Sequence, residues 1–198
     1  LAGGAESPRD LPVPGRDLDG VMAFRDIADV DRMLDAAGKY KEAVVIGGGL
    51  LGLEAANGLM KKGMQVTVVH LMDVLMERQL DSEAAALLRK SLEERGMKFA
   101  MGGRTEEILG EGGRVSGVKL ADGTILPAQL VVMAIGIKPN VDIARRAGIH
   151  CDRGIVVDDT MLSYDGRIYA VGECAQHRGA VYGLVAPLFE QGKVCAVH

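Results

Sequence analysis

The first regular pattern of hydrophobic positions in the chain has the period of a helix. Between Asp26 and Gly38, apolar residues recur every three or four positions, which places them on one helical face. The residues of that face are Ile27, Val30, Met33 and Leu34. Asp is a residue type that caps helix N-termini, and Gly is one that ends helices. The pattern therefore predicts an amphipathic helix over residues 27–37.

The elements of a parallel α/β unit are predicted next, from apolar runs and helical spacing. They are a strand over residues 43–46, a helix over 50–61, a strand over 66–69 and, after a further helix, a strand over 97–101. The further helix begins after Asp81, a capping residue type, and ends at Gly96. Strands that alternate with helices in this order form a parallel sheet.

After residue 101 the hydrophobic period changes to two, the period of half-buried strands. The segments 105–109, 114–120 and 124–126 are separated by the turn sequences GEGG and ADG. We expect these segments to form a small antiparallel meander. The apolar run QLVVMAIG, residues 129–136, then predicts another strand that is buried on both faces.

The pattern beyond Pro139 is less regular. Two short runs, 155–157 and 168–171, have the composition of strands. A final, largely apolar stretch over residues 184–197 predicts a helix. Taken together, the elements predict an α/β fold.

Composition and charge exclude several classes of protein. The chain has 198 residues, 48% of them hydrophobic, which is enough for one large domain or two small ones. The net charge of −4 comes from interspersed acidic and basic residues, so we expect no surface for nucleic acid or an anionic membrane. No apolar run approaches the roughly 18 residues of a membrane span, and no secretory signal pattern opens the chain.

The three cysteines and four histidines form no recognisable metal or redox motif. Cys151, Cys174 and Cys195 are far apart and include no C-x-x-C pair. The histidines show no spacing typical of metal ligands. We therefore expect no metal site, reduced thiols and a cytoplasmic protein.

The most informative motif follows the first strand of the parallel unit. Gly47, Gly49 and Gly52 form the pattern G-x-G-x-x-G between a strand and a helix, which is typical of dinucleotide-binding units. The first glycine allows a tight turn, the second lets backbone approach a pyrophosphate, and the third lets the helix pack closely on the strand. The amides of Leu50 and Leu51 are expected to face the phosphates. A Rossmann-shaped unit without a ligand is the alternative.

His70 ends the second parallel strand, where such units normally carry Asp or Glu for the adenosine ribose. A neutral imidazole can accept or donate one hydrogen bond there, but it does not repel a 2′-phosphate. Arg78 in the following loop could meet a 2′-phosphate, whereas Asp73 and Glu77 make the same loop more negative. The balance favours NADH only slightly. A strand-end residue without a role in cofactor choice is the alternative for His70.

The order of these motifs resembles that of the pyridine nucleotide–disulfide oxidoreductase superfamily, the two-dinucleotide flavoprotein reductases. The resemblance covers nearly the whole chain and rests on the segments GGGLLGLEAA, VVMAIGIKPN and IYAVGE and on the meander. The start, AGGAESPR, is similar to the family's A-T-G-x-x-P-R, with Gly3 in place of Thr and one extra residue before Pro8.

The resemblance implies a division of the chain. A Rossmann-like NAD(P)H-binding domain with an antiparallel β-meander, residues 38–139, is expected to be inserted in remnants of an FAD-binding domain. The remnants are a connector and helix over residues 1–37 and a C-terminal part over 140–198. Most of the first flavin piece, including its own G-x-G-x-x-G, is absent, so we expect no stable FAD in this chain.

Two stretches resemble one subgroup of the superfamily more closely. They are HLMDVLMERQLD, residues 70–81, and IYAVGECAQHRGAVYGLVAPLFEQGKV, residues 168–194. Both are similar to the flavin-containing portion of assimilatory nitrite reductase large subunits. That subgroup carries His at the end of the second strand and Glu after AVG, where the superfamily usually has Asp. The resemblance thus accounts for both His70 and Glu173.

The resemblance also implies which residues lie at the nicotinamide dinucleotide. These are Gly47, Gly49, Leu50, Leu51, Gly52 and His70. Glu54 matches a glutamate near the nicotinamide ring, with an exposed helix carboxylate as the alternative. Gly136 matches a glycine that lets backbone approach the cofactors.

The flavin positions are implied in the same way. Gly172 and Glu173 match the turn at the ribityl chain, and Val185 and Ala186 begin a helix whose amides face the pyrimidine end. Because hydride transfer needs no acid or base from the protein, we assign no catalytic residue.

The implied function is that of an FAD-dependent NAD(P)H oxidoreductase, which passes hydride to FAD for onward nitrite reduction. Sirohaem and iron–sulfur centres would lie outside this chain, since it has no cysteine cluster to hold them. The implied partners are the remaining domains of the same polypeptide or a small subunit. A ferredoxin or rubredoxin reductase, and a non-catalytic NAD-binding module, are the alternatives.

Overall fold

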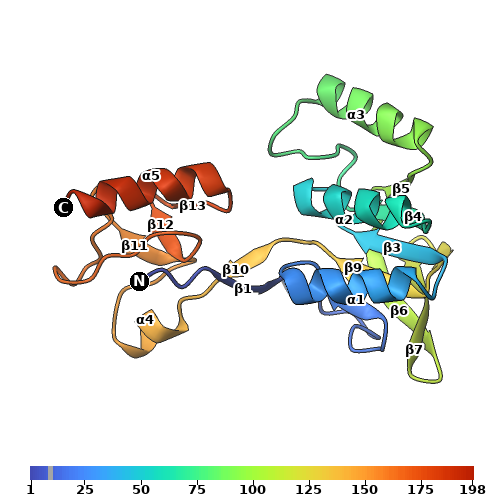
Figure 1. The fold of residues 1–198 in the computed structure, drawn as a ribbon, viewed down its shortest axis with the longest axis horizontal. Helices are drawn as coiled ribbons and strands as arrows, with labels where there is room; N and C mark the ends of the chain where they lie inside the picture. The colour runs from blue at the N-terminus through green and yellow to red at the C-terminus, as the bar shows by residue number, and fades with distance from the viewer. Residues whose placement is uncertain (9–10) are drawn as a thin grey trace. The chain divides into compact units, whose positions relative to one another are not determined.

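A computed structural model describes residues 1–8 and 11–198 of the chain. The chain divides into two compact units, Asp10–Ile135 and a smaller unit made of Leu1–Arg9 and Gly136–His198 (Figure 1). Each unit has its own sheets and its own hydrophobic core. Arg9, which belongs to the predicted connector motif, lies outside the described residues.

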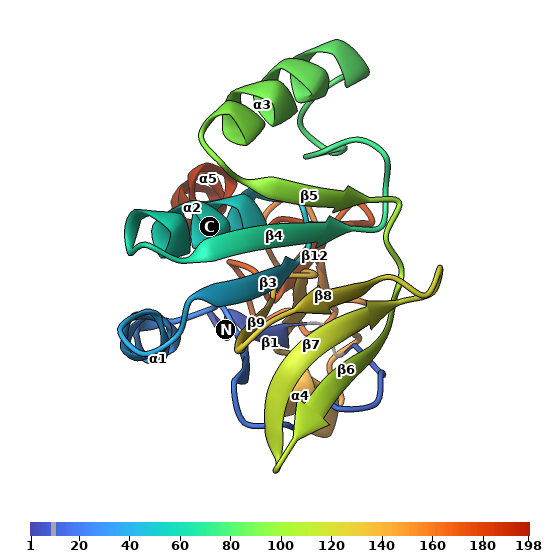
Figure 2. The ribbon, with the colours of Figure 1, turned by 90° about the vertical axis from the view of Figure 1, so that its right-hand side faces the viewer.

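A five-stranded parallel sheet forms the centre of the larger unit (Figure 2). Its strands, in spatial order, are β2 (Val21–Ala23), β9 (Leu130–Met133), β3 (Glu42–Ile46), β4 (Gln65–His70) and β5 (Lys98–Met101). All neighbouring strands pair in parallel. The connecting helices are α1 (Ile27–Ala37), α2 (Leu50–Lys61) and α3 (Ser82–Glu94). The predicted parallel α/β unit is therefore confirmed.

The central strand β3 is buried on both faces of the sheet. Because successive residues of a strand point to opposite faces, Val45 packs into one core and Val44 into another. The core around Val45 includes Leu53 of α2, and the core around Val44 includes Ile108 of the meander. Helices thus cover one face of the sheet, and the meander covers the other (Figure 2).

The meander forms as the period-two pattern predicted. β6 (Thr105–Glu111), β7 (Arg114–Leu120) and β8 (Ile125–Pro127) pair in sequence order, all antiparallel. In the first turn, Gly112 and Gly113 have φ angles of 59° and 83°, which glycine adopts at no steric cost. The meander occupies the chain between β5 and β9, where a helix would otherwise connect two parallel strands.

In its described residues, the smaller unit contains two short sheets and two helices. β1 (Ala5–Pro8) pairs with β10 (Ile137–Pro139), and β11 (Ile155–Val157), β12 (Ala175–His177) and β13 (Ala180–Val181) form the other sheet. Its helices are α4 (Asp142–Arg146) and α5 (Val185–Ala196). Buried Ile155 and Ala175 from neighbouring strands pack with Ala144 of α4 in one core.

One sequence prediction about local structure is wrong, and another is confirmed with an unexpected buried face. The predicted strand 168–171 makes only an isolated bridge, from Tyr169 to Leu162, within the described backbone. The helix predicted over residues 27–37 is confirmed, but its apolar face is largely exposed, with Ile27 at 80%, and Met33 is the only buried residue of that face. The buried residues of α1 are instead Asp29, Met33, Ala36 and Ala37.

Asp29 explains why the buried face of α1 was missed. Its carboxylate accepts the backbone N–H of Arg25 at 2.7 Å and pairs with the Arg32 side chain. These bonds satisfy the buried charge, so an acidic residue lies on the packed face. The predicted N-cap is confirmed, because the Asp26 side chain accepts the Asp29 N–H at 2.9 Å.

The boundaries of the larger unit differ from those expected. The sequence predicts a flavin remnant over residues 1–37, but Val21 of β2 pairs with Val131 of β9, and α1 contributes to the core on the helix side. At the other end, the larger unit ends at Ile135 and not at Pro139, because β10 pairs with β1. The short strands β1 and β2 were not predicted, since three or four residues carry too little periodicity.

Candidate dinucleotide site

The glycine-rich loop between β3 and α2 is shaped by two glycines that no larger residue can replace. Gly47 has a φ of 122°, and a Cβ atom there would lie 2.3 Å from the carbonyl oxygen of Ala134. A Cβ atom on Gly52 would lie 1.9 Å from the carbonyl oxygen of Gly47. The loop therefore packs tightly against its neighbours, as the tight-turn and close-packing roles of these two glycines require.

Gly49 differs from both, because space is open beside it. It is the N-cap of α2, with φ −82° and ψ −177°, and a Cβ atom there would meet no described atom within 4 Å. None of the described side chains caps the helix at this end. Leu50 and Leu51 follow and are 42% and 38% exposed. A ligand can therefore approach the backbone at the start of α2.

Gly48, which is not one of the three glycines of the G-x-G-x-x-G pattern, anchors the loop. Its N–H donates to Nδ1 of His70 at 3.0 Å, and its carbonyl oxygen accepts the N–H of Met76 at 3.1 Å. A Cβ atom on Gly48 would lie 2.7 Å from both the His70 ring and the Leu75 side chain. The sequence signal for this residue is the uninterrupted triplet of glycines at 47–49.

His70 lies at the end of β4 with only 8% of its surface exposed. Since Nδ1 accepts the Gly48 N–H, the ring proton is on Nε2, which lies 3.1 Å from the carbonyl oxygen of Val74. The same Nε2 lies 3.3 Å from Oε2 of Glu77. Both ring nitrogens thus contact protein groups, so a direct bond from His70 to a ribose would require one of these contacts to break.

The other predicted residues of the larger unit are accessible. Glu54 is exposed on α2, four residues after Leu50 and therefore on the same side of the helix. Arg78 is exposed in the loop that follows β4. The structure thus brings the glycine loop, the end of β4 and the following loop together, with Glu54 farther along α2.

The predicted flavin residues lie in the smaller unit. Gly172 has a φ of 91°, and its N–H donates at 2.8 Å to Oε1 of Gln191, a buried residue of α5. This bond ties the turn that contains Glu173 to the helix that begins at Val185 and Ala186. Among the described side chains, none caps α5 at this end. Gly136, with a φ of 109°, opens the second segment of this unit.

The described residues form neither a metal-binding cluster nor a membrane-spanning helix. Across residues 1–8 and 11–198, no group of three or more His, Cys, Asp or Glu side chains is placed to hold a metal ion. Within the same ranges, none of the helices combines the length and apolar character needed to cross a membrane.

Comparisons with known proteins identify the family. The family model for pyridine nucleotide-disulphide oxidoreductases matches residues 1–191. A nitrite reductase (NAD(P)H) from Bacillus subtilis is 57% identical over 191 residues, which are 96% of this chain and 24% of that protein. The assimilatory nitrate reductase electron transfer subunit of the same bacterium is 49% identical over 192 residues, or 97% of this chain and 25% of that protein.

A solved structure supports the same assignment. The crystal structure of the ferredoxin reductase for the CYP199A2 system from Rhodopseudomonas palustris has a TM-score of 0.94 and 35% sequence identity. The match covers 100% of this chain and 50% of the ferredoxin reductase chain. The chain belongs to the pyridine nucleotide-disulphide oxidoreductase family. The predicted resemblance and the α/β fold are confirmed, and the chain spans about a quarter of the length of the two curated relatives.

Proposed function

We propose that the larger unit binds NAD(P)H with the pyrophosphate against the loop between β3 and α2. The observation that carries this proposal is the open space at Gly49, where no described atom lies within 4 Å of an added Cβ. An anion beside Gly49 would accept hydrogen bonds from the amides of Leu50 and Leu51, at the positive end of α2. Membership of a pyridine nucleotide-dependent family supports the same ligand.

The residues around the loop then have separate tasks. Gly47 and Gly52 give the loop its shape, and Gly48 joins it to the end of β4. Glu54, exposed on α2, is assigned to the nicotinamide end of the ligand, and Arg78 to its adenosine end. None of these residues needs to transfer a proton, because they bind and orient the ligand.

The smaller unit is proposed to contact FAD. Gly172 and Glu173 would bind the ribityl chain, while the amides of Val185 and Ala186 would stabilise negative charge on the flavin ring. The hydrogen bond from Gly172 to Gln191 holds these two groups together, which fits a shared ligand. When bound, the flavin supplies a ring that accepts hydride from NAD(P)H and passes electrons on one or two at a time.

For the whole protein we propose onward reduction of nitrite. The 57% identity to a nitrite reductase supports this reaction, with sirohaem and iron–sulfur centres in other domains. The proposed partners are those domains or a small subunit. Cys151, Cys174 and Cys195 are free thiols, as in proteins of a reducing compartment, and we propose the cytoplasm.

A ferredoxin reductase is the second candidate, because the ferredoxin reductase structure covers the whole chain. The two functions differ in the electron acceptor. The test is NADH oxidation by the full-length protein with nitrite, or with a ferredoxin, as the only acceptor. We expect turnover with nitrite and formation of ammonium. Turnover with ferredoxin alone would replace our proposal with the second candidate.

A further inference from the structure

The loop between β4 and α3 is held firmly against the glycine loop. Leu75 in this loop is 1% exposed and belongs to the core on the helix side of the sheet. The N–H of Met76 donates to the carbonyl oxygen of Gly48 at 3.1 Å, and Met76 itself has a left-handed φ of 52°. A non-glycine residue adopts this conformation at a cost, so the surrounding contacts must maintain it.

His70 also contacts Glu77, the residue that follows Met76 in the loop. Through Nδ1 the ring is bonded to Gly48, and through Nε2 it lies 3.1 Å from the Val74 carbonyl oxygen and 3.3 Å from the Glu77 carboxylate. The single Nε2–H faces both of these acceptors. The side chain of Glu77 is 38% exposed, so its carboxylate lies against the His70 ring on one side and is open to solvent on the other. The chain thus presents a carboxylate in contact with the end of β4, although β4 itself ends in His.

We infer that Glu77 supplies the carboxylate that the strand end lacks. Resting on the proposed function, this inference assigns Glu77 as the acceptor for the adenosine ribose hydroxyls of the bound dinucleotide. A carboxylate accepts both hydroxyls of a ribose diol, and it repels a 2′-phosphate. The site is therefore selective for NADH over NADPH, and His70 is a positioning residue that orients Glu77.

Two other charged side chains of the same loop bear on this selectivity. Asp73 is exposed and adds to the repulsion of a phosphate, whereas exposed Arg78 would attract it. Of the three, Glu77 is the one that His70 holds at the end of β4. The inference therefore predicts that the selectivity follows Glu77 and not Arg78.

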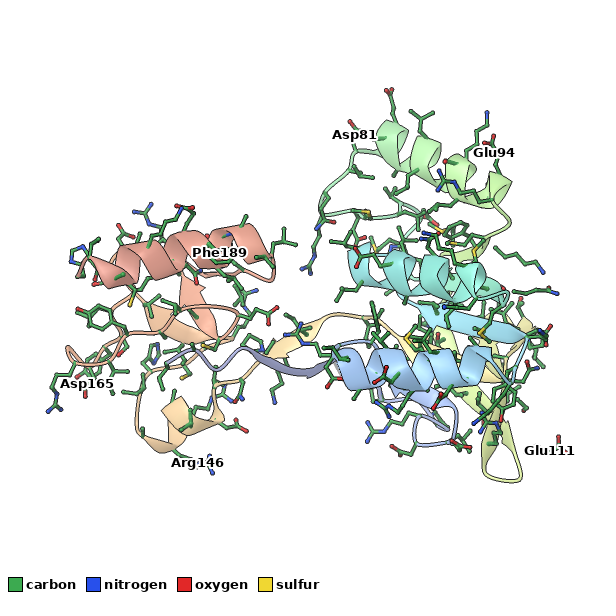
Figure 3. The ribbon with its side chains drawn as sticks, in the orientation of Figure 1. Asp81, Glu94, Glu111, Arg146, Asp165 and Phe189 are labelled. Carbon is green, nitrogen blue, oxygen red and sulfur yellow. The ribbon has the colours of Figure 1, made fainter. Side chains whose placement is uncertain are left out.

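The test compares dissociation constants for NADH and NADPH by calorimetry. The wild-type 198-residue chain is compared with Glu77→Gln, and Glu94→Gln is the matched control at the far end of α3 from Asp81 (Figure 3). Losing one charge-assisted interaction of about 1.5–3 kcal/mol corresponds to roughly ten- to a hundredfold in affinity. We expect Glu77→Gln to lower the preference for NADH by at least about tenfold and Glu94→Gln to leave it unchanged.

His70→Phe tests the positioning role. Substitution of a residue that only supports the fold would weaken the binding of NADH and NADPH equally. The ratio of the two affinities therefore distinguishes the two roles. We expect His70→Phe to lower that ratio as Glu77→Gln does, and the double variant to lower it no further. Additive effects on the ratio would contradict the positioning role.

The outcomes separate this inference from the proposed function. If the wild-type chain binds neither dinucleotide, both are overturned. If it binds them but Glu77→Gln leaves the ratio unchanged, only the role of Glu77 is overturned. A ratio of NADH to NADPH affinity that changes with Arg78→Gln and not with Glu77→Gln would likewise overturn the role of Glu77. Glu77→Gln keeps the size of the side chain, and an unchanged melting temperature verifies that the variant is folded.

Discussion

The two turns that we assign to cofactors are built in different ways. In the larger unit, the middle glycine of the loop, Gly48, is bonded to His70 and Met76, and an added Cβ would clash with the His70 ring. In the smaller unit, an added Cβ on Gly172 would meet no described atom within 4 Å. There the N–H of Gly172 donates a hydrogen bond to Gln191 of α5.

The difference indicates how each site obtains its shape. The glycine loop is fixed by close packing within its own unit, so it is organised before a ligand binds. In the smaller unit, the space beside Gly172 is open, and α5 exposes apolar Val185 and Phe189, each at 68%. Phe189 is labelled in Figure 3. Substitutions that perturb the packing around the glycine loop should therefore cost more stability than substitutions at exposed positions of α5.

The largest expected difference is between two apolar truncations. Leu75→Ala removes a side chain that is 1% exposed, and we expect the free energy of unfolding to fall by about 2–5 kcal/mol. Phe189→Ala removes one that is 68% exposed, and we expect a change within about 0.5 kcal/mol. Urea denaturation measures both. Equal losses would contradict the comparison, because they would require Phe189 to be as well packed as Leu75.

A smaller change in stability, of opposite sign in the two units, is expected when one methyl group is added to each unit. Gly48→Ala places a Cβ 2.7 Å from His70 and Leu75, and we expect destabilisation by about 1–3 kcal/mol. Gly192→Ala lies within α5, where the Cβ would meet no described atom within 4 Å. Because alanine favours helix, we expect stabilisation by about 0.5–1 kcal/mol. Thermal melts that shift in the same direction for both variants would refute this account of the loop.

The smallest expected effect concerns acid stability. In the described part of the smaller unit, four aspartates have pKa values below the usual range because hydrogen bonds stabilise their charged form. They are Asp152, Asp158, Asp159 and Asp165. For Asp159 the main causes are hydrogen bonds from the side chains of Arg178 and His177, which lower its pKa strongly.

The sign of this effect follows from the lowered pKa of Asp159. Its stabilisation is complete above the ordinary pKa of 3.8 and is lost as the pH falls through the lowered value of the folded state. Asp159→Asn removes this dependence. We expect the drop in melting temperature between about pH 7 and about pH 3 to be smaller for the variant than for wild type. Identical drops would show that the Asp159 contacts do not persist in solution.

The sequence predicted the elements whose periodicity or turn residues were strong. The glycines at 112–113 marked the first hairpin, and the run 43–46 marked the central strand, because a strand buried on both faces is continuously apolar. β2 was missed because its three residues gain strand structure only by pairing with β9. The buried face of α1 was missed because hydrophobic periodicity does not register a satisfied buried acid such as Asp29.

The candidate site was predictable in part for a similar reason. The roles of Gly47 and Gly52 depend on local backbone geometry, which the spacing of the motif specifies. The contacts of His70 depend on how the loop after β4 folds back, and no periodic pattern encodes that loop. The bond from Gly48 to His70 and the position of Glu77 therefore needed the structure.

The most direct test of the proposed site is NADH binding by Gly49→Val compared with Gly58→Val. Both glycines lie where an added Cβ would meet no described atom within 4 Å, and the extended backbone of Gly49, φ −82° and ψ −177°, suits valine. We expect Gly49→Val to keep the melting temperature of the wild type. We expect it to weaken NADH binding by at least about a hundredfold, or roughly 2.7 kcal/mol, because the valine methyl groups fill the space of the pyrophosphate. Gly58→Val, farther along α2, should bind NADH as wild type does. Wild-type NADH affinity in folded Gly49→Val would show that the dinucleotide does not bind at this loop.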